Sequence, residues 1–140
     1  MEEKDYDEVF FDKDVIHPSE GYIHEAALQP EREKSQLPVL YEDASGELYV
    51  ENGNSALIRA KAAGHKSAKV LIYRAEDEPD DFKDTLECVR RAKALGTRTL
   101  DDLRERRLDD SAYRRIDALE GNIEAQKREL DLYLESRQHQ

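Results

Sequence analysis

The 140-residue chain has no tryptophan, one cysteine and one methionine. The single cysteine, Cys88, excludes a disulfide within the chain and is typical of a reducing compartment, so we expect a cytoplasmic protein. No apolar run approaches the roughly 20 residues that a membrane-spanning helix needs, which predicts a protein without membrane contact. The first residues, MEEKDYDEVFF, lack the basic flank and apolar stretch of a signal peptide.

Basic residues are outnumbered, with 22 Lys and Arg against 33 Asp and Glu, and the net charge is −11. A surface with this average field repels a phosphate backbone, so direct nucleic-acid binding is not expected. Solubility or adaptation to high salt would explain the acidity. A functional alternative is an acidic DNA mimic that inhibits a DNA-binding protein.

Strand signals dominate the first half of the chain. Residues 8–16 read as a strand that ends before Pro18, and residues 20–34 as a short helix or helical loop. Residues 37–43 and 47–53 predict a hairpin around the turn Ala44-Ser45-Gly46. Residues 54–64 predict a helix that Gly64 ends. Residues 67–74 contain four consecutive apolar residues and predict a strand covered on both faces.

Helix signals dominate the second half of the chain. Helices are expected over residues 85–96, over 99–108 with Thr99 as the N-cap, and over 109–138 as one long helix with Gly121 as its weak point. The chain is therefore expected to be an α+β protein. Its predicted parts are a core over residues 1–76, an acidic connector over 77–84 and a helical extension over 85–140.

The last predicted helix has a short apolar seam with heptad spacing. Its members are Ile116, Leu119, Ile123, Leu130 and Tyr133, with Gln126 in one core position. The seam is shorter than the roughly three to four heptads of a convincing coiled coil. Two interpretations stay open: the helix packs on its own chain, or it forms an association surface for a homodimer or a partner protein.

A strand, a Gly-containing turn and a helix follow one another in VENGNSALIRAKAAG, residues 50–64. With its flanking strands, the stretch from about Val9 to Tyr73 resembles the ParB/sulfiredoxin-like fold of partition proteins, small kinases and sulfiredoxin. Partition proteins enter this helix through a Gly-Glu-Arg-Arg box and leave it through Ala-Gly. The resemblance implies a nucleotide or anion site, whose positions here are Asn52, Gly53, Asn54, Ser55 and Arg59.

The charged residues of the family's box are missing from this chain. Asn54, Ser55 and Ala56 stand where the family has a glutamate and two arginines. Neutral side chains cannot replace the charge-assisted hydrogen bonds of arginine. Nearby carboxylates are expected to weaken triphosphate binding further; these are Glu42, Asp43, Glu47 and Glu51. Sulfiredoxin chemistry is excluded, because Cys88 lies far outside the turn.

Structural roles explain the residues that remain at the turn. Asn54 or Ser55 is expected to cap the helix by accepting a hydrogen bond from an exposed amide, and Gly53 permits an unusual backbone angle. Arg59 is expected to pair with a local carboxylate on another part of the helix surface. The alternative is an anion held at the helix N-terminus.

No other pattern in the sequence predicts catalysis or a cofactor. His17 and His24 are too few for a metal site, and no Ser or Cys has a histidine that the sequence places beside it. We expect no catalytic residues, no metal and no cofactor.

The leading hypothesis is a non-catalytic interaction or regulatory protein on a degenerate ParB-like scaffold from a phage, plasmid or other mobile element. It would bind a protein partner, or dimerise through the C-terminal helix. The alternatives are a nucleotide-binding (ATP or CTP) switch or kinase, and the DNA mimic.

Overall fold

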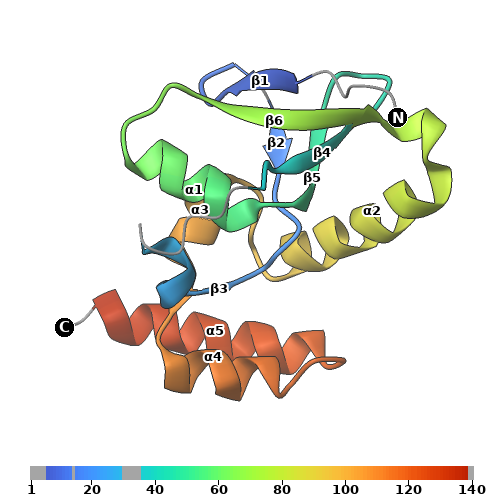
Figure 1. Cartoon of the computed structure of the whole chain (residues 1–140). Coiled ribbons are helices and arrows are strands. Elements are labelled where there is room, and N and C mark those ends of the chain that lie inside the picture. Colours follow the sequence, from blue (N-terminus) through green and yellow to red (C-terminus); the bar gives the residue numbers. More distant parts are fainter. Residues whose placement is uncertain (1–5, 14, 30–35, 139–140) are drawn as a thin grey trace.

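A mixed five-stranded sheet in the order β1-β6-β4-β5-β2 is the centre of the fold (Figure 1). The computed structural model describes residues 6–13, 15–29 and 36–138. Helices pack on the sheet and form the C-terminal part, so the predicted α+β class is confirmed. The strands of the sheet are β1 (Tyr6–Phe10), β6 (Ser67–Arg74), β4 (Val39–Glu42), β5 (Leu48–Asn52) and β2 (Ile16–His17).

The sheet is strongly curled, because a short link joins its two edge strands. Only residues 11–15 separate β1 from β2, whereas four strand spacings of a flat sheet measure about 19 Å. The link is shortened further by a turn in which Lys13 N donates to Phe10 O. The prediction of one strand over residues 8–16 is therefore wrong, since its polar middle is a turn between opposite edges.

One face of the sheet carries aliphatic side chains. Leu40 of β4 lies opposite Val50 of β5 and Ile72 of β6, so the three side chains share one face of the sheet. They share a core cluster with Leu57 of α1 (Asn54–Ala62) and Leu103 of α3 (Leu100–Glu105). The predicted hairpin and the predicted strand over residues 67–74 are both confirmed.

The other face of the sheet carries aromatic side chains. Tyr41 lies opposite Tyr49 and Tyr73, and His17 stacks on Tyr49 with ring centroids 4.8 Å apart. Phe82 of α2 meets Tyr41 and Tyr49 edge-on, at 5.9 and 5.3 Å. The sheet is thus covered on both faces, which explains its continuous apolar runs.

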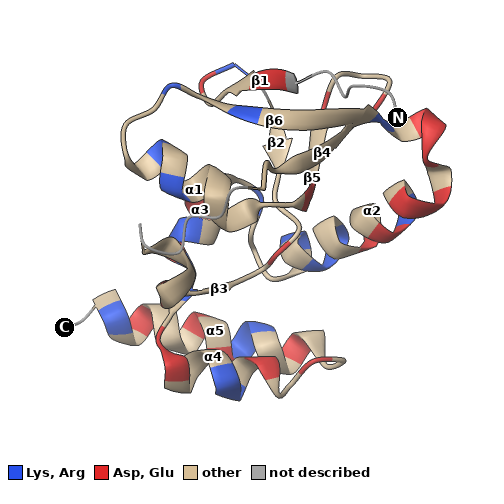
Figure 2. Cartoon of the chain, viewed as in Figure 1, with Lys and Arg blue, Asp and Glu red and all other residues tan. Residues whose placement is uncertain are grey.

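Helix α2 (Pro79–Ala94) begins inside the predicted acidic connector. Proline at the first helical position loses no hydrogen bond, and Asp80 and Asp81 favour the positive end of the helix dipole. Figure 2 shows the resulting polarity, with acidic residues along the first half of α2 and basic residues along the second. Residues 79–84 therefore form helix, and α2 links the sheet to the C-terminal helices.

The C-terminal part is a helical hairpin rather than one long helix. Helices α4 (Asp110–Asp117) and α5 (Ile123–Gln138) pack side by side (Figure 1), and the chain turns between them through Gly121 at φ +94°. Before them, Thr99 caps α3 in a capping box with Asp102, as predicted for Thr99. The prediction of a continuous helix is wrong at the weak point that the sequence indicated.

A small parallel pair joins the two parts of the chain. Strand β3 (Ile23–His24) pairs with β7 (Arg107–Leu108), and the 3-10 helix η1 (Glu25–Leu28) follows β3. A second 3-10 helix, η3 (Ala75–Asp77), precedes α2. Within the described ranges, no helix combines the length and apolar character needed to cross a bilayer.

The second half of the chain contributes residues to two separate core clusters. Leu100 and Leu103 belong to the first, beneath the sheet. The second cluster lies between the C-terminal helices, and its buried members are Leu95, Leu108, Ala112, Ile116 and Leu130. The chain thus passes from the second cluster to the first after Leu95, and back before Leu108.

Candidate functional site

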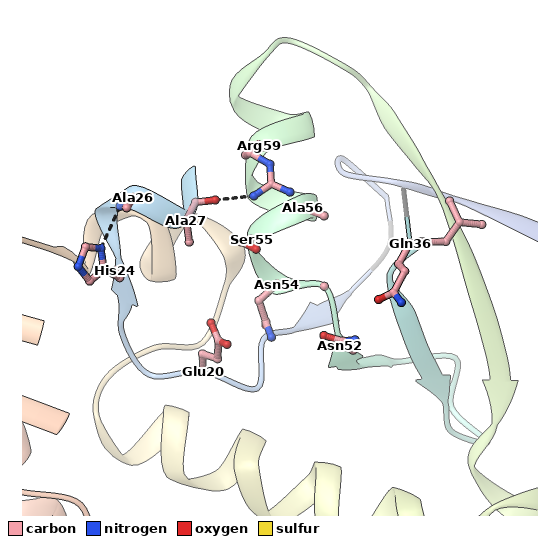
Figure 3. A pocket seen from close by; sticks show the side chains of 12 residues that line it. Glu20, His24, Ala26, Ala27, Gln36, Asn52, Asn54, Ser55, Ala56 and Arg59 are labelled. Carbon is pink, nitrogen blue, oxygen red and sulfur yellow. Dashed lines mark hydrogen bonds between the residues drawn. The ribbon is translucent and has the colours of Figure 1, made fainter. Parts of the chain in front are cut away.

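A pocket of about 450 Å³ lies at the start of helix α1 (Figure 3). Its walls come from the end of β5, the first turns of α1, the segment after β2 through η1, and the residues before β4. All five residues that the sequence places at the implied nucleotide or anion site line this pocket. The polar lining residues are Glu20, His24, Gln36, Asn52, Asn54, Ser55 and Arg59.

Gly53 sets the path of the chain into the pocket wall. Its φ is +106°, in the left-handed region that favours glycine, and it is the N-cap residue of α1. A Cβ here would lie 2.6 Å from Pro38 Cβ and 2.7 Å from Pro38 Cα. The backbone angle and this close approach together require glycine.

Asn54 does not cap the helix, contrary to the expectation from sequence. Its Oδ1 accepts a hydrogen bond from Ser19 N, and its Nδ2 donates to Ser19 Oγ, both at 3.0 Å. The side chain is buried, with 5% of its surface exposed. Asn54 therefore fastens the segment after β2 to the start of α1.

The first turn of α1 consequently has unsatisfied amides. No side chain caps the helix, and the bond from Leu57 N to Gly53 O is the first in the helical ladder. The amides of Asn54, Ser55 and Ala56 have no helical carbonyl to bind, and all three residues line the pocket. The positive end of the α1 dipole thus lies at the pocket wall.

Arg59 adds a positive charge to the same wall. Its Nη1 donates to the carbonyl oxygen of Ala27 in η1, which holds the guanidinium beside the pocket (Figure 3). The expectation that Arg59 points elsewhere and pairs with a carboxylate is wrong, because a backbone carbonyl is its partner. Spacing alone could not show this, since Ala27 lies 32 residues away.

Glu20 is the one carboxylate among the described residues that line the pocket. Its side chain reaches the surface, yet crowding by protein atoms raises its pKa above the usual value. Among the described residues, neither Glu20 nor Arg59 forms an ion pair. Nothing in the sequence indicated Glu20, because the loop that carries it precedes the turn by more than 30 residues.

The four carboxylates expected around the turn lie outside the pocket lining. Asp43 and Glu47 stand at the opposite end of the hairpin, where Asp43 Oδ1 accepts from Ser45 N and Glu47 N. Glu42 is the last residue of β4 before that turn. Glu51 precedes Asn52 and points to the other side of the strand, since successive side chains alternate. The prediction of a carboxylate ring at the turn is therefore wrong.

His24 lines the pocket, but both of its ring nitrogens are engaged. Nδ1 accepts from Ala26 N at 3.0 Å and so caps η1, while Nε2 lies 3.1 Å from Asp110 Oδ1. Because Nδ1 accepts, Nε2 carries the hydrogen and donates to Asp110. His24 is therefore not free to take a proton from the hydroxyl of Ser55.

Metal chemistry has no support in the described part of the chain. There, no three His, Cys, Asp or Glu side chains come together as metal ligands would. His17 and His24 have separate partners, since His17 Nε2 lies 3.0 Å from Glu47 Oε1. Cys88 lines a second hollow of about 230 Å³, where Arg91 Nη2 lies 3.7 Å from its sulfur.

The predicted association residues belong to the interface between α4 and α5 within the chain. Ile116 and Leu130 are fully buried, and Ile123 and Tyr133 pack against the cluster that contains them. Leu119 is half-buried in the turn after α4. Association through this seam would require the two helices to separate, so the packing alternative explains the heptad spacing.

No protein-family model matches the chain, and no curated protein matches its sequence. The crystal structure of protein Atu1540 from Agrobacterium tumefaciens is similar at 12% sequence identity, with a TM-score of 0.48. The likeness covers 94% of this chain and 80% of that chain. A structural similarity this weak supports no statement about function. The resemblance to the ParB/sulfiredoxin-like fold stays a prediction.

Proposed function

We propose that the chain is a non-catalytic binding protein that holds the anionic group of a small polar ligand in the α1 pocket. The observation that carries the proposal is the uncapped first turn of α1. The first three residues of this turn, whose amides have no helical carbonyl to bind, line the same pocket as Arg59. Helix amides and arginine are the groups that bind phosphate and carboxylate oxygens.

The size and charge of the pocket favour a small ligand. Its volume of about 450 Å³ lies in the range of roughly 300–1,000 Å³ that is usual for small-molecule sites. Arg59 is the one Lys or Arg among the described lining residues, and Glu20 opposes negative charge. One guanidinium and three amides suit a carboxylate or a monophosphate better than a triphosphate, whose four negative charges need more cations.

Binding is favoured over catalysis because neither base of the described lining, His24 or the Glu20 carboxylate, is hydrogen-bonded to the hydroxyl of Ser55. A serine nucleophile needs a base within hydrogen-bond reach. Ser55 shares the pocket with His24, whose nitrogens are occupied by Ala26 N and Asp110. The hypotheses of a protein partner and of a mobile-element context stay predictions beside this proposal.

The test is a titration of the whole chain with inorganic phosphate, acetate, ATP and CTP, with magnesium added for the nucleotides. Calorimetry measures binding, and the shift of the thermal unfolding midpoint measures stabilisation by each probe. We expect saturable, salt-sensitive phosphate and acetate binding that is at least tenfold weaker in Arg59→Gln. Lys61→Gln is the matched control, because Lys61 on the same helix pairs with Asp101 at 2.9 Å outside the pocket. Tighter binding of ATP or CTP than of phosphate would support the nucleotide alternative.

A substitution that occupies the anion position separates binding from simple charge effects. Ser55→Asp places a carboxylate in the first turn of α1, where it stabilises the helix by about 0.3–1 kcal/mol. We expect this variant to melt higher and to lose phosphate binding, while the neutral Ser55→Asn retains it. The proposal is overturned if no probe gives a saturable signal, or if Ser55→Asp binds phosphate as the wild type does.

A further inference from the structure

We infer that the ligand of this pocket is zwitterionic, with its anionic group at the start of α1 and Arg59 and its cationic group at Glu20. The inference rests on the proposed function and names the chemical class of the ligand. It depends on two opposite charges that line one cavity and that have no ion-pair partner among the described residues.

The positive and negative walls of the pocket are built by different elements. Arg59 and the free amides belong to α1, whereas Glu20 lies in the segment between β2 and β3. In Figure 3 the Glu20 carboxylate lies beneath the first turn of α1, and Arg59 lies beyond that turn. The Asn54–Ser19 hydrogen bonds hold these two elements together one residue away from Glu20. These bonds fix the backbone next to Glu20 against the start of α1.

A purely anionic ligand would share the cavity with the Glu20 carboxylate and be repelled by it. Glu20 reaches the surface, yet the protein atoms around its carboxylate raise its pKa, and a cation placed beside it in the cavity would stabilise the charged form. A purely cationic ligand would be repelled by Arg59 and by the positive end of the α1 dipole in the same way. A molecule with an ammonium and a carboxylate or phosphate satisfies both walls.

The neutral lining residues fit a polar ligand of this kind. Asn52 and Gln36 offer amide donors and acceptors to the ligand's polar groups, and both side chains are labelled in Figure 3. Ala26, Ala27 and Ala56 leave room beside them and offer only small apolar contacts. The pocket thus provides charge at two sides and hydrogen bonding between them.

The experiment compares unbranched ω-amino acids with carboxylates of the same chain length. Calorimetry on the whole chain uses glycine, 3-aminopropanoate, 4-aminobutanoate and 5-aminopentanoate against acetate, propanoate, butanoate and pentanoate. We expect one amino acid of the series to bind at least tenfold more tightly than its matched carboxylate. In Glu20→Gln this preference falls below threefold, and the carboxylates bind more tightly than they do to the wild type.

Glu51→Gln is the matched control, since it removes an exposed carboxylate next to Asn52 but outside the pocket lining. We expect this variant to keep the preference for the amino acid. Equal binding of the two series by the wild type, or an unchanged preference in Glu20→Gln, overturns the zwitterion inference and leaves the proposed anion site standing. Absence of binding by both series, together with absence of phosphate binding, removes the site itself.

Discussion

The side chain of Asn54 forms two hydrogen bonds with Ser19, one to its amide and one to its hydroxyl, each 3.0 Å long. This contact spans 35 residues of sequence and joins two walls of the α1 pocket. Because the same side chain would otherwise be available to cap α1, the contact also leaves the helix amides free for a ligand. One asparagine thus both shapes the pocket and leaves its anion-binding groups exposed.

Replacing Asn54 with alanine should destabilise the protein more than replacing its partner. Asn54→Ala leaves the Ser19 amide without its acceptor, at a cost of about 1–3 kcal/mol. Ser19→Ala removes a single hydroxyl bond, worth about 0.5–1.5 kcal/mol. Urea unfolding measures both free energies. The opposite order of the two variants would show that the Ser19 amide finds another acceptor.

Gly53 and Gly64 form a matched pair for testing the close approach to Pro38. Both have positive φ, +106° and +91°, so alanine at either position is strained by roughly 1–2 kcal/mol. A Cβ at Gly64 meets nothing within 4 Å, whereas one at Gly53 meets Pro38 at 2.6 Å. We expect Gly53→Ala to lower the free energy of unfolding by at least 1 kcal/mol more than Gly64→Ala. Equal losses would show that the turn moves away from Pro38 without cost.

Ionised Asp43 should stabilise the fold, and this contribution should be lost at acidic pH. The Ser45 hydroxyl, followed by the Tyr49 hydroxyl and the amides of Glu47 and Ser45, donates to this carboxylate and lowers its pKa. A group with a lowered pKa stabilises the fold above its unfolded pKa of about 3.9, and this contribution is lost as the pH falls through the folded value. Below about pH 4 the wild type should therefore lose stability more steeply than Asp43→Asn.

The pH comparison needs a control that removes the same charge without these hydrogen bonds. Glu42→Gln serves, because Glu42 is an exposed neighbour that makes none of the bonds of Asp43. Urea midpoints between pH 3 and pH 7 should show a flattened profile for Asp43→Asn and a profile like that of the wild type for Glu42→Gln. Identical slopes for Asp43→Asn and the wild type would contradict the assignment.

Leu130 and Leu132, two residues apart on α5, distinguish packing within the chain from association. Leu130 is fully buried, whereas 54% of Leu132 is exposed. We expect Leu130→Ala to cost about 2–5 kcal/mol and Leu132→Ala less than about 0.5 kcal/mol. Neither the wild type nor Leu130→Ala should depend on protein concentration in its unfolding midpoint. An unfolding midpoint that rises with protein concentration would show that the seam is an interface between chains.

The central elements could be predicted because their signals are local. Four consecutive apolar residues define β6, Gly64 ends α1, and Thr99 caps α3. The turn residues of the pocket could be found for the same reason, since Asn52 to Ser55 are adjacent in the sequence. Periodicity also identified the apolar seam of the last segment, although it could not say whether the seam contacts its own chain or another.

What the sequence missed depends on contacts between distant segments. The partner of Asn54 is Ser19, the partner of Arg59 is Ala27, and both lie in segments without a repeating pattern. A side chain that can cap a helix locally was predicted to do so, and a tertiary hydrogen bond replaced that local one. Glu20 reaches the pocket because β2 pairs in parallel with β5, so the loop after β2 and the start of α1 after β5 leave the sheet at the same edge.

The segment that contributes residues to both core clusters determines how the protein unfolds. Leu95 and Leu108 are embedded in one cluster, and Leu100 and Leu103 between them are embedded in the other. Because the same short stretch of backbone is anchored in both clusters, we expect the unfolding of one cluster to disturb the other. Melting should therefore be a single cooperative event, and deletion of residues 97–140 should destabilise the sheet, because it removes Leu100 and Leu103 from the core of the sheet.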